Sequence, residues 1–396
     1  MNNQFKIPLM RNAFIEEKKI KKELANFVLN CDRFSMGSEV RKFEENFASF
    51  TNSKYAVMVN SGGSANLLML QVLKNQGKIN TGDNIAYTSL TWSTNIFPII
   101  QLGFNPIPID VDVNTLNCSL KSIENTIKNY DIKCLFLTNV LGFASDLIKV
   151  KKLCYDNNVT LIEDNCESLG SRFKDNSLTG RHGVMSSHSF FIAHHMSTIE
   201  GGMIITDDFD IYESLKMSRA NGWDRDLSKK TQDVLRKKHE INSDFYAKYT
   251  FYDLGYNVRP TEISGFLGNQ QIQYLNKTIE LRSSNSIILN KKIETLDYIL
   301  PLKADYMSLI SNFAHVFIFN DKDAMKKVYQ NFVKNRIEIR PIIAGNMVNQ
   351  PFYSKYNLEK IDLPGAQFIH KNGFYCGNYP EMNEDDLKLI NKSLDI

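Results

Sequence analysis

Short apolar runs alternate with amphipathic stretches of helical length between about residue 55 and residue 210. The apolar runs lie at residues 55–59, 84–90, 106–112, 134–140 and 160–165. Strands that alternate with helices in this way pack into a layered α/β domain with a largely parallel sheet. Ligands of such domains bind at the edge where strands end and helices begin, so we look for functional residues there.

The second half of the chain has a different pattern. Residues 224–250 are polar and Lys-rich, which predicts a long surface connection, and residues 261–296 predict one long helix. Strand-like runs such as AHVFIF (314–319) then suggest a smaller α+β unit. We expect a large α/β domain over residues 1–250, and a connecting helix with a small C-terminal α+β domain over residues 251–396.

Composition narrows the functional classes open to the chain. Its 47 lysines and arginines exceed its 44 acidic residues by three, whereas nucleic-acid-binding proteins usually carry a concentrated basic face. No stretch approaches the roughly 20 apolar residues of a membrane span, and no signal-peptide pattern is present. The six cysteines include no CxC or CxxC pair, which disfavours a disulfide framework or a thiolate metal site. We therefore expect a cytoplasmic protein that binds neither nucleic acid nor a membrane.

The first segment that could carry chemistry is NSGGSANLLML, residues 60–70. Gly62 and Gly63 stand between an apolar run and an amphipathic stretch, where backbone N–H groups can approach an anion and a helix dipole favours negative charge. A tight turn that binds nothing would have the same sequence. A phosphate site and a plain turn both remain open.

The second segment, LIEDNCESLGS at residues 161–171, ends an apolar run on acidic side chains. Glu163, Asp164 and Glu167 are expected at the mouth of the sheet. A buried carboxylate there needs a cationic ring nitrogen, an Arg or Lys, or backbone donors. Ligand binding and structural hydrogen bonding are both compatible with this segment alone.

The third segment, residues 187–208, carries the adjacent histidines His194 and His195 before a glycine-rich return into MIITDD. A buried histidine is usually a packing residue, although paired histidines can also bind a metal. No carboxylate or cysteine lies at a convincing ligand spacing, so we expect no metal site.

In this order and at these separations, the three segments resemble the DegT/DnrJ/EryC1/StrS sugar aminotransferase family. Further matching stretches are GSEVRKFEENFASF, LTWSTNIFPIIQLGFNPIPIDVD, LGYNVRPTEISGFLGNQQI and RPIIAGN. The resemblance implies the aspartate aminotransferase fold, type I, with a seven-stranded, mostly parallel sheet in the large domain and a smaller C-terminal α+β domain. It also implies pyridoxal 5′-phosphate or pyridoxamine 5′-phosphate as the cofactor.

The chain departs from this family at the position of the catalytic lysine. The family normally reads SFxxxK, with the lysine joined to the cofactor, whereas this chain reads SFFIAH from Ser189 to His194. No lysine lies between Lys174 and Lys216, so a one-residue shift of the alignment cannot restore it. Imidazole forms no stable imine, but it can remove a proton near neutral pH.

The histidine resembles that of a subgroup that removes the C3 hydroxyl of nucleotide-linked 4-keto sugars. This implies a 3-dehydratase of deoxysugar biosynthesis for lipopolysaccharide or capsule, in which His194 is the catalytic base and ammonia is released. One branch acts on CDP-sugars with an iron–sulfur cluster. The other, of the colitose pathway, needs no cluster, regenerates its amine from L-glutamate and acts on GDP-4-keto-6-deoxy-mannose. The cysteine pattern and the stretches HHMSTIEGG and RPIIAGN favour the cluster-free branch.

The resemblance also implies roles for residues around the cofactor. Asp164 matches the aspartate that pairs with the pyridinium nitrogen, Glu167 lies near the phenolic oxygen, and Trp92 matches the aromatic side chain that stacks on the ring. The phosphate-binding positions are Gly62, Gly63 and Ser189.

Other residues are expected to bind substrates or a second subunit. Asn257 matches a residue that reaches the phosphate from the neighbouring subunit, which implies a homodimer with shared active sites. Arg259 and Arg340 are candidates for the glutamate carboxylate or the nucleotide phosphates, for which a planar bidentate fork is suited. Surface ion pairing is the alternative for both arginines, and His195 is expected to be structural.

Two other functions stay open. A nucleotide-sugar 4-aminotransferase would use a lysine from elsewhere in the chain, and a non-catalytic protein would bind pyridoxal phosphate without turnover. Retention of Asp164 and Trp92 beside a base-capable His194 argues against the second. The sequence does not decide between a hexose and a heptose, and CDP remains open beside GDP.

Overall fold

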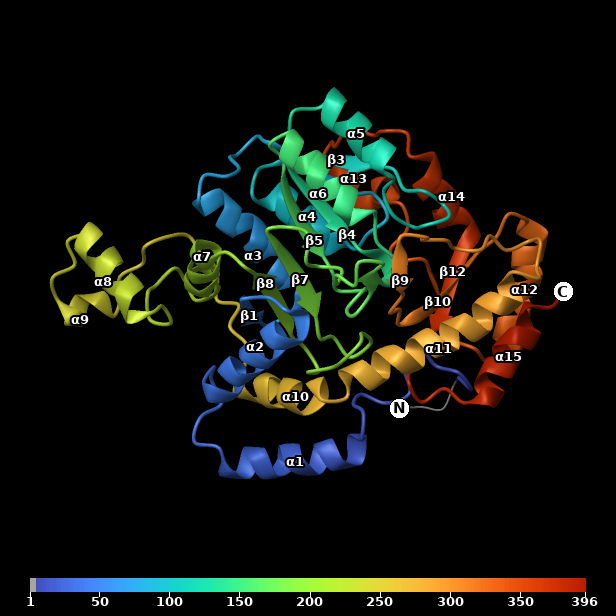
Figure 1. Cartoon of the computed structure of the whole chain (residues 1–396), viewed down its shortest axis with the longest axis horizontal. Helices are drawn as coiled ribbons and strands as arrows, with labels where there is room; N and C mark the ends of the chain where they lie inside the picture. Colours follow the sequence, from blue (N-terminus) through green and yellow to red (C-terminus); the bar gives the residue numbers. More distant parts are fainter. Residues whose placement is uncertain (1–4) are drawn as a thin grey trace.

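A computed structural model describes residues 5–396 and contains a seven-stranded and a three-stranded sheet (Figure 1). The strands of the large sheet are β1 (Tyr55–Val59), β2 (Asn84–Thr88), β3 (Asn105–Ile109), β4 (Ile132–Thr138), β5 (Thr160–Asp164), β7 (Met185–Ser189) and β8 (Gly202–Thr206). They lie in the order β1-β8-β7-β5-β4-β2-β3. Only β8 is antiparallel to its neighbours in this sheet. The predicted mostly parallel sheet and its α/β class are confirmed.

Helices follow the strands as the alternating pattern predicts. They are α2 (Ser38–Thr51), α3 (Gly62–Asn75), α4 (Ser93–Gln101), α5 (Leu120–Asn129), α6 (Leu147–Asp156) and α7 (Phe209–Arg219). Helix α3 packs on β7 and β8, α2 and α7 pack on β1, and α6 packs on β5. Strands β7 and β8 are buried along their whole length because both faces of the sheet are covered.

The C-terminal ends of β1, β2, β4, β5 and β7 meet at one edge of the large sheet because these strands run in the same direction. Strand β8 starts at this edge with Gly202. A Cβ on Gly202 would lie 2.3 Å from the carbonyl oxygen of Ser61, so only glycine lets β8 begin against the turn after β1. This close approach brings the first and third segments of the sequence together.

The second unit is built on a small antiparallel sheet, β10-β12-β11. Its elements are β10 (Ala314–Ile318), α12 (Lys322–Lys334), β11 (Ile339–Pro341), η2 (Met347–Asn349), α13 (Pro351–Lys355), α14 (Pro364–Asn372), β12 (Gly373–Gly377) and α15 (Glu384–Leu394). Other short or peripheral elements are α1 (Glu17–Asn30), η1 (Val140–Gly142), and the short strands β6 (Arg172–Phe173) and β9 (Met307–Leu309), which pair with each other.

The prediction of one long helix over residues 261–296 is wrong in one respect. The segment forms two helices, α10 (Glu262–Ile272) and α11 (Leu275–Ile293), separated at residues 273–274. Helix α10 packs closely on α2, where a Cβ on Gly265 would lie 2.6 Å from the backbone nitrogen of Val40. The break lets α10 follow α2 while α11 runs on toward the small sheet (Figure 1).

The Lys-rich segment over residues 224–250 lies at the surface as predicted, and it also forms helices. These are α8 (Lys229–Lys238), none of whose residues is buried, and the short α9 (Asp244–Ala247). Both project from the body of the molecule (Figure 1). No helix described in residues 5–396 is both long and apolar enough to cross a membrane.

We propose that the boundary between the large domain and the C-terminal unit lies near residue 250, as expected from the sequence. Helix α11 connects the two units, and the small sheet has its own hydrophobic core, which includes Phe317, Phe332 and Ile390. Ile7 belongs to this second core and pairs with Ile337, so the beginning of the described chain packs with the C-terminal unit.

Candidate active site

A cavity of about 420 Å³ lies at the C-terminal edge of the large sheet, within the size range of cofactor sites. Seven of the predicted site residues line it: Gly62, Gly63, Trp92, Asp164, Glu167, Ser189 and His194. They come from the ends of β1, β2, β5 and β7 and from the loops that follow. The topology therefore brings together most of the cofactor residues that the sequence suggested.

The N-terminus of α3 forms one end of the cavity. Ser61 caps the helix, because its Oγ accepts a hydrogen bond from the backbone nitrogen of Ser64 at 3.1 Å. A Cβ on Gly62 would lie 2.8 Å from Cβ of Ser189, and a Cβ on Gly63 would lie 2.9 Å from Cγ2 of Thr94. The bare backbone at a helix N-terminus is suited to hold a phosphate, which favours the phosphate site over a plain turn.

Asp164 is buried at the end of β5 and is held by three neutral donors. Its Oδ2 accepts from the side-chain amides of Asn66 and Asn95, both at 2.8 Å, and its Oδ1 accepts from the backbone nitrogen of Cys166 at 2.9 Å. Among residues 5–396, no lysine or arginine forms an ion pair with Asp164. Its negative charge is therefore fixed in position and is available to a cationic group in the cavity.

Asn66 and Asn95, on α3 and α4, hold Asp164 and were not among the site residues predicted from the sequence. Asn66 is itself oriented by Ser187, whose hydroxyl donates to its Oδ1 at 2.6 Å, and the Thr91 hydroxyl donates to Asn95 at 2.9 Å. Both asparagines stand in the quoted stretches NSGGSANLLML and LTWSTN. In the sequence, each asparagine is a polar amide on the otherwise apolar face of an expected helix, and this could have marked it as a site residue.

Glu163 is a structural residue. Its two carboxylate oxygens accept from the backbone nitrogens of Gly180, His182 and Gly183 at 2.7–2.8 Å and from the side chain of Asn139 at 3.0 Å. Successive side chains of a strand point to opposite faces, so Glu163 faces the 180–183 turn while Asp164 faces the cavity.

Glu167 is buried at the cavity wall with a weaker set of partners. Its Oε2 accepts from the backbone nitrogen of Leu141 at 3.0 Å. Burial raises the pKa of Glu167 to about 8, and the nearby charge of Asp164 adds to the rise. At neutral pH Glu167 is therefore largely protonated and can donate a hydrogen bond.

His194 lies in the loop after β7, with its ring stacked on Phe313. The ring centroids are 5.1 Å apart and the interplanar angle is 16°. The ring of Phe191 is nearly perpendicular to that of His194, with the two centroids 5.9 Å apart. Burial lowers the pKa of His194 to about 4; the charge of Asp164 opposes this shift and that of Arg282 adds to it. The imidazole is therefore neutral at physiological pH and able to accept a proton.

His195 points away from the cavity. Its Nε2 lies 2.9 Å from the carbonyl oxygen of Ser311, and the residue is buried. Burial holds the pKa of His195 well below its usual value. These contacts support the expected structural role.

Three predicted residues lie outside the His194 cavity of one subunit. Asn257 and Arg259 line a separate cavity of about 340 Å³, where Nε of Arg259 donates to Oδ1 of Asn257 at 3.0 Å. Arg340 is exposed and forms an ion pair with Glu338 at 2.6 Å. The roles of these residues stay predictions.

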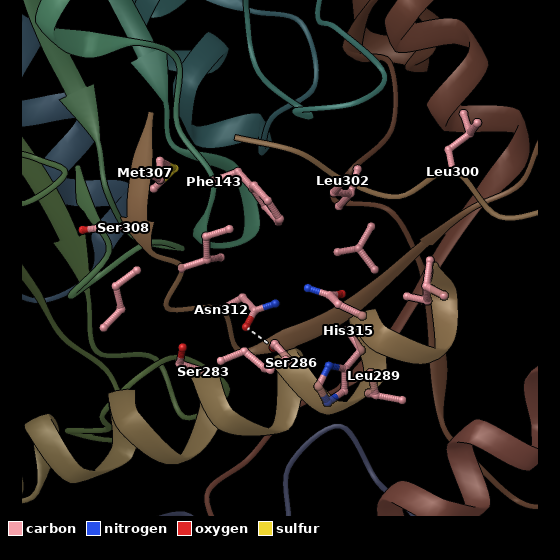
Figure 2. Close-up of a pocket in the computed structure, with 16 residues that line it drawn as sticks. Phe143, Ser283, Ser286, Leu289, Leu300, Leu302, Met307, Ser308, Asn312 and His315 are labelled. Atoms are coloured by element: carbon pink, nitrogen blue, oxygen red, sulfur yellow. Dashed lines mark hydrogen bonds between the residues drawn. The ribbon is translucent and has the colours of Figure 1, made fainter. Parts of the chain in front are cut away.

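Another cavity, of about 190 Å³, lies between α11 and residues 300–310. Figure 2 shows Ser286 and Asn312 on one side, joined by a 2.8 Å hydrogen bond, and Leu300 and Leu302 on the other. No charged side chain lines this cavity, and none of the predicted site residues reaches it. A charged cofactor is therefore better matched by the cavity at the sheet edge.

The sheet order and this cavity define an enzyme of the aminotransferase fold. The DegT/DnrJ/EryC1/StrS aminotransferase family matches residues 15–395, and the chain belongs to that family. No cluster of three or more His, Cys, Asp or Glu within residues 5–396 is arranged to hold a metal ion.

Two curated relatives share the same name. The GDP-4-keto-6-deoxy-D-mannose 3-dehydratase of Escherichia coli O55:H7 is 33% identical over 373 residues, which cover 93% of this chain and 94% of that protein. The enzyme of that name from Yersinia pseudotuberculosis is 32% identical, with 92% of this chain and 93% of that protein covered.

A solved structure of GDP-4-keto-6-deoxymannose-3-dehydratase with a trapped PLP-glutamate geminal diamine superposes with a TM-score of 0.89. It is 32% identical and covers 98% of this chain and 100% of that one. The aminotransferase PseC of Helicobacter pylori, at 21% identity and a TM-score of 0.82, shows the same fold.

Proposed function

We propose that the chain is a pyridoxamine-phosphate-dependent 3-dehydratase that removes the C3 hydroxyl of a GDP-linked 4-keto-6-deoxy sugar. The observation that carries the proposal is the neutral imidazole of His194 on the wall of a cavity that also holds the fixed carboxylate of Asp164. The E. coli and Yersinia relatives, which bear the name of this activity over nearly the full length of both chains, support it.

The residues present fit this cofactor. A Cβ would fill the space beside Gly62, and Asp164 has carboxylate oxygens without a cationic partner in the described chain. When bound, the cofactor supplies a protonated ring that accepts an electron pair from the adjoining carbon. Asp164 would keep the ring nitrogen protonated, the N-terminus of α3 and Ser189 would bind the phosphate, and Trp92 would cover the ring.

Glu167 would face the phenolic oxygen of the ring. Because its pKa is raised to about 8, Glu167 can donate a hydrogen bond to this oxygen, whereas an ionised carboxylate would repel it.

His194 supplies the proton transfer. Its neutral ring can take a proton at Nε2 or Nδ1 and deliver it to the departing C3 hydroxyl, which leaves as water. Within the part of the chain that the structure describes, no lysine lines the cavity, so its walls offer no amine to complete an ordinary transamination at C4. This disfavours the alternative of a 4-aminotransferase.

L-glutamate would return the amine to the cofactor. The two electrons that reduce C3 then come from glutamate, which becomes 2-oxoglutarate, and the sugar amine is lost as ammonia to restore the 4-keto group. The sugar loses one oxygen overall, and this oxygen is balanced by the keto oxygen of 2-oxoglutarate. Both substrates are cytoplasmic metabolites, so we place the reaction in the cytoplasm.

A homodimer would complete the site. Asn257 and Arg259 do not line the His194 cavity of their own subunit, and they share a cavity with Trp223 and Arg225, which precede the projecting α8–α9 segment. This region exposes a group of large aromatic side chains: Phe245, Tyr246, Tyr249 and Phe251. Such a patch is typical of a protein interface, and we propose that a second copy of the chain covers it.

The glutamate half of the reaction tests the proposal without the sugar. Purified protein with pyridoxal phosphate and L-glutamate should form pyridoxamine phosphate and 2-oxoglutarate, and borohydride should leave no cofactor attached to the protein. Attachment to a lysine would support the 4-aminotransferase, and failure to form pyridoxamine phosphate would support a non-catalytic binder.

A further inference from the structure

Arg282, on α11, is a buried arginine that forms no ion pair in the described part of the chain. Its side chain is almost completely inaccessible, at 2% exposure. Burial lowers the pKa of Arg282 to about 10, and the charge of Glu381, which lies too far away for an ion pair, opposes this shift. The guanidinium therefore stays charged at neutral pH. A buried charge without a partner costs several kcal/mol, which a purely structural residue would avoid.

The protein group that Arg282 holds belongs to His194. Its Nη2 donates a hydrogen bond to the backbone carbonyl of His194 at 3.0 Å, while Nε and Nη1 have no partner among residues 5–396. The two residues are 88 positions apart. This bond joins the loop between β7 and β8 (residues 190–201, the catalytic loop) to α11.

We propose that Arg282 is the positioning residue of the catalytic loop: its guanidinium holds the His194 carbonyl and so keeps the imidazole stacked on Phe313 at the cavity wall. This inference rests on the proposed role of His194 as the base. Arg282 does not line the cofactor cavity, so it acts through His194 and not on the substrate.

Arg282 is held on a fixed support. Its own carbonyl accepts from the side-chain amide of Asn378 at 3.0 Å, which ties α11 to the end of β12. One turn earlier, Ile279 packs so closely on Gly170 that a Cβ there would lie 2.2 Å from Cδ1 of Ile279. Helix α11 is therefore fixed at Ile279 and at Arg282.

The charge of Arg282 also acts on the imidazole. The ionised groups that face His194 are Asp164 from β5, which raises its pKa, and Arg282 from α11, which lowers it. His195 is the neighbouring titratable group on the same loop, and its own pKa lies well below the usual value. Removing the Arg282 charge should therefore raise the pKa of His194 while the Asp164 charge remains.

Arg282→Met tests this directly, because methionine keeps much of the apolar stem without the charge or the donors. Replacing an unpaired buried charge with an apolar side chain is often tolerated. The His194 ring signal in isotope-labelled holoenzyme, assigned with His194→Asn, should titrate about one unit or more higher than in the wild type. Arg172→Met removes a half-buried arginine whose guanidinium donates hydrogen bonds to Asn176, and it should leave this titration unchanged.

Arg282→Lys is the second variant, since it keeps the charge without the planar fork. In this variant, His194 should titrate close to its wild-type pH. The kcat for the glutamate half-reaction should lie between the values of the wild type and of Arg282→Met, and the cofactor affinity should be unchanged. An unchanged His194 titration and unchanged kcat in folded Arg282→Met would overturn the inference. The His194 titration can be measured without turnover. A wrong proposal about Arg282 can therefore be distinguished from a wrong proposal about the dehydratase activity.

Discussion

Single residues determine the chemistry of this site through their surroundings. Asp164 and Glu167 are carboxylic acids in one cavity, yet Asp164 has three hydrogen-bond donors whereas Glu167 has one and a pKa raised to about 8. Two carboxyl groups with different surroundings can take different roles. Here Asp164 can supply a fixed negative charge, and the protonated Glu167 can donate a hydrogen bond. His194 completes the set as a neutral base.

His194→Asn should stop deoxygenation and leave the cofactor bound. Asparagine keeps a polar side chain of similar reach but accepts no proton, so the rate should fall about 100-fold or more. Sugar product and the absorbance of bound cofactor measure the two effects. Unchanged turnover would remove His194 from the mechanism.

The wild-type rate should depend on pH in the direction set by His194. Its pKa of about 4 means that the free ring is unprotonated above that pH. The kcat/KM for glutamate should therefore lose no activity to protonation of His194 between about pH 5 and 7, and should fall below this range as the ring takes up a proton. An acid limb with a midpoint near 6.5 would contradict the low pKa of His194.

Glu167→Gln should remove a pH-dependent cost to stability. In the wild type, the pKa of Glu167 is about 8 in the folded state and about 4.3 in the unfolded state. Between these pH values the folded protein holds one more proton than the unfolded chain. Its free energy of unfolding therefore falls as the pH rises. Glutamine cannot ionise, so the variant should gain about 2 kcal/mol or more relative to the wild type between pH 5 and pH 8. Denaturant unfolding at both pH values measures the gain, and an equal difference at both would refute the raised pKa.

At the scale of elements, helix starts and strand ends build the site. The N-terminus of α3 carries no side chain at Gly62 or Gly63 and is pressed against Ser189 and Thr94. The phosphate site therefore depends on close packing between helices and strands as much as on the glycines themselves.

Gly63→Ala should weaken cofactor binding about tenfold or more, because the new Cβ would lie 2.9 Å from Cγ2 of Thr94 and displace the helix start. Thr94→Ser removes that methyl group, so the double variant should recover most of the affinity. Titration of the apoprotein with pyridoxal phosphate measures it. Failure of Thr94→Ser to improve Gly63→Ala would show that the contact is not the cause.

Much of this arrangement could be predicted from the sequence. The alternating pattern predicted five of the seven strands of the large sheet, β1 to β5, but not β7 and β8. The resemblance predicted the cavity residues from Gly62 to His194. The break between α10 and α11 could not be seen, because both helices continue the same apolar pattern and only packing on α2 separates them. Arg282 was also invisible, since its contact with His194 spans 88 positions.

At the scale of the whole molecule, the proposed dimer would explain why residues with expected cofactor or substrate roles lie in two cavities. Asn257 and Arg259 belong to one, and His194 to the other. A closed dimer with twofold symmetry would bring the Asn257 cavity of each subunit next to the His194 cavity of its partner.

Mixing two inactive variants tests this arrangement. Subunits of His194→Asn and of Asn257→Ala should each be inactive as homodimers, but a mixed dimer holds one site with both residues intact. Unfolding and refolding an equal mixture should recover about one quarter of the wild-type sites. No recovery in a mixture shown to contain heterodimers would argue that sites are not shared.

The most direct test of the central claim is the mass of the sugar product. Purified protein, pyridoxal phosphate and L-glutamate should convert GDP-4-keto-6-deoxy-mannose into a nucleotide sugar that is lighter by one oxygen atom, with ammonia and 2-oxoglutarate formed alongside. A product that keeps every sugar oxygen except that of the C4 keto group, and carries an amine at C4 instead, would contradict the account.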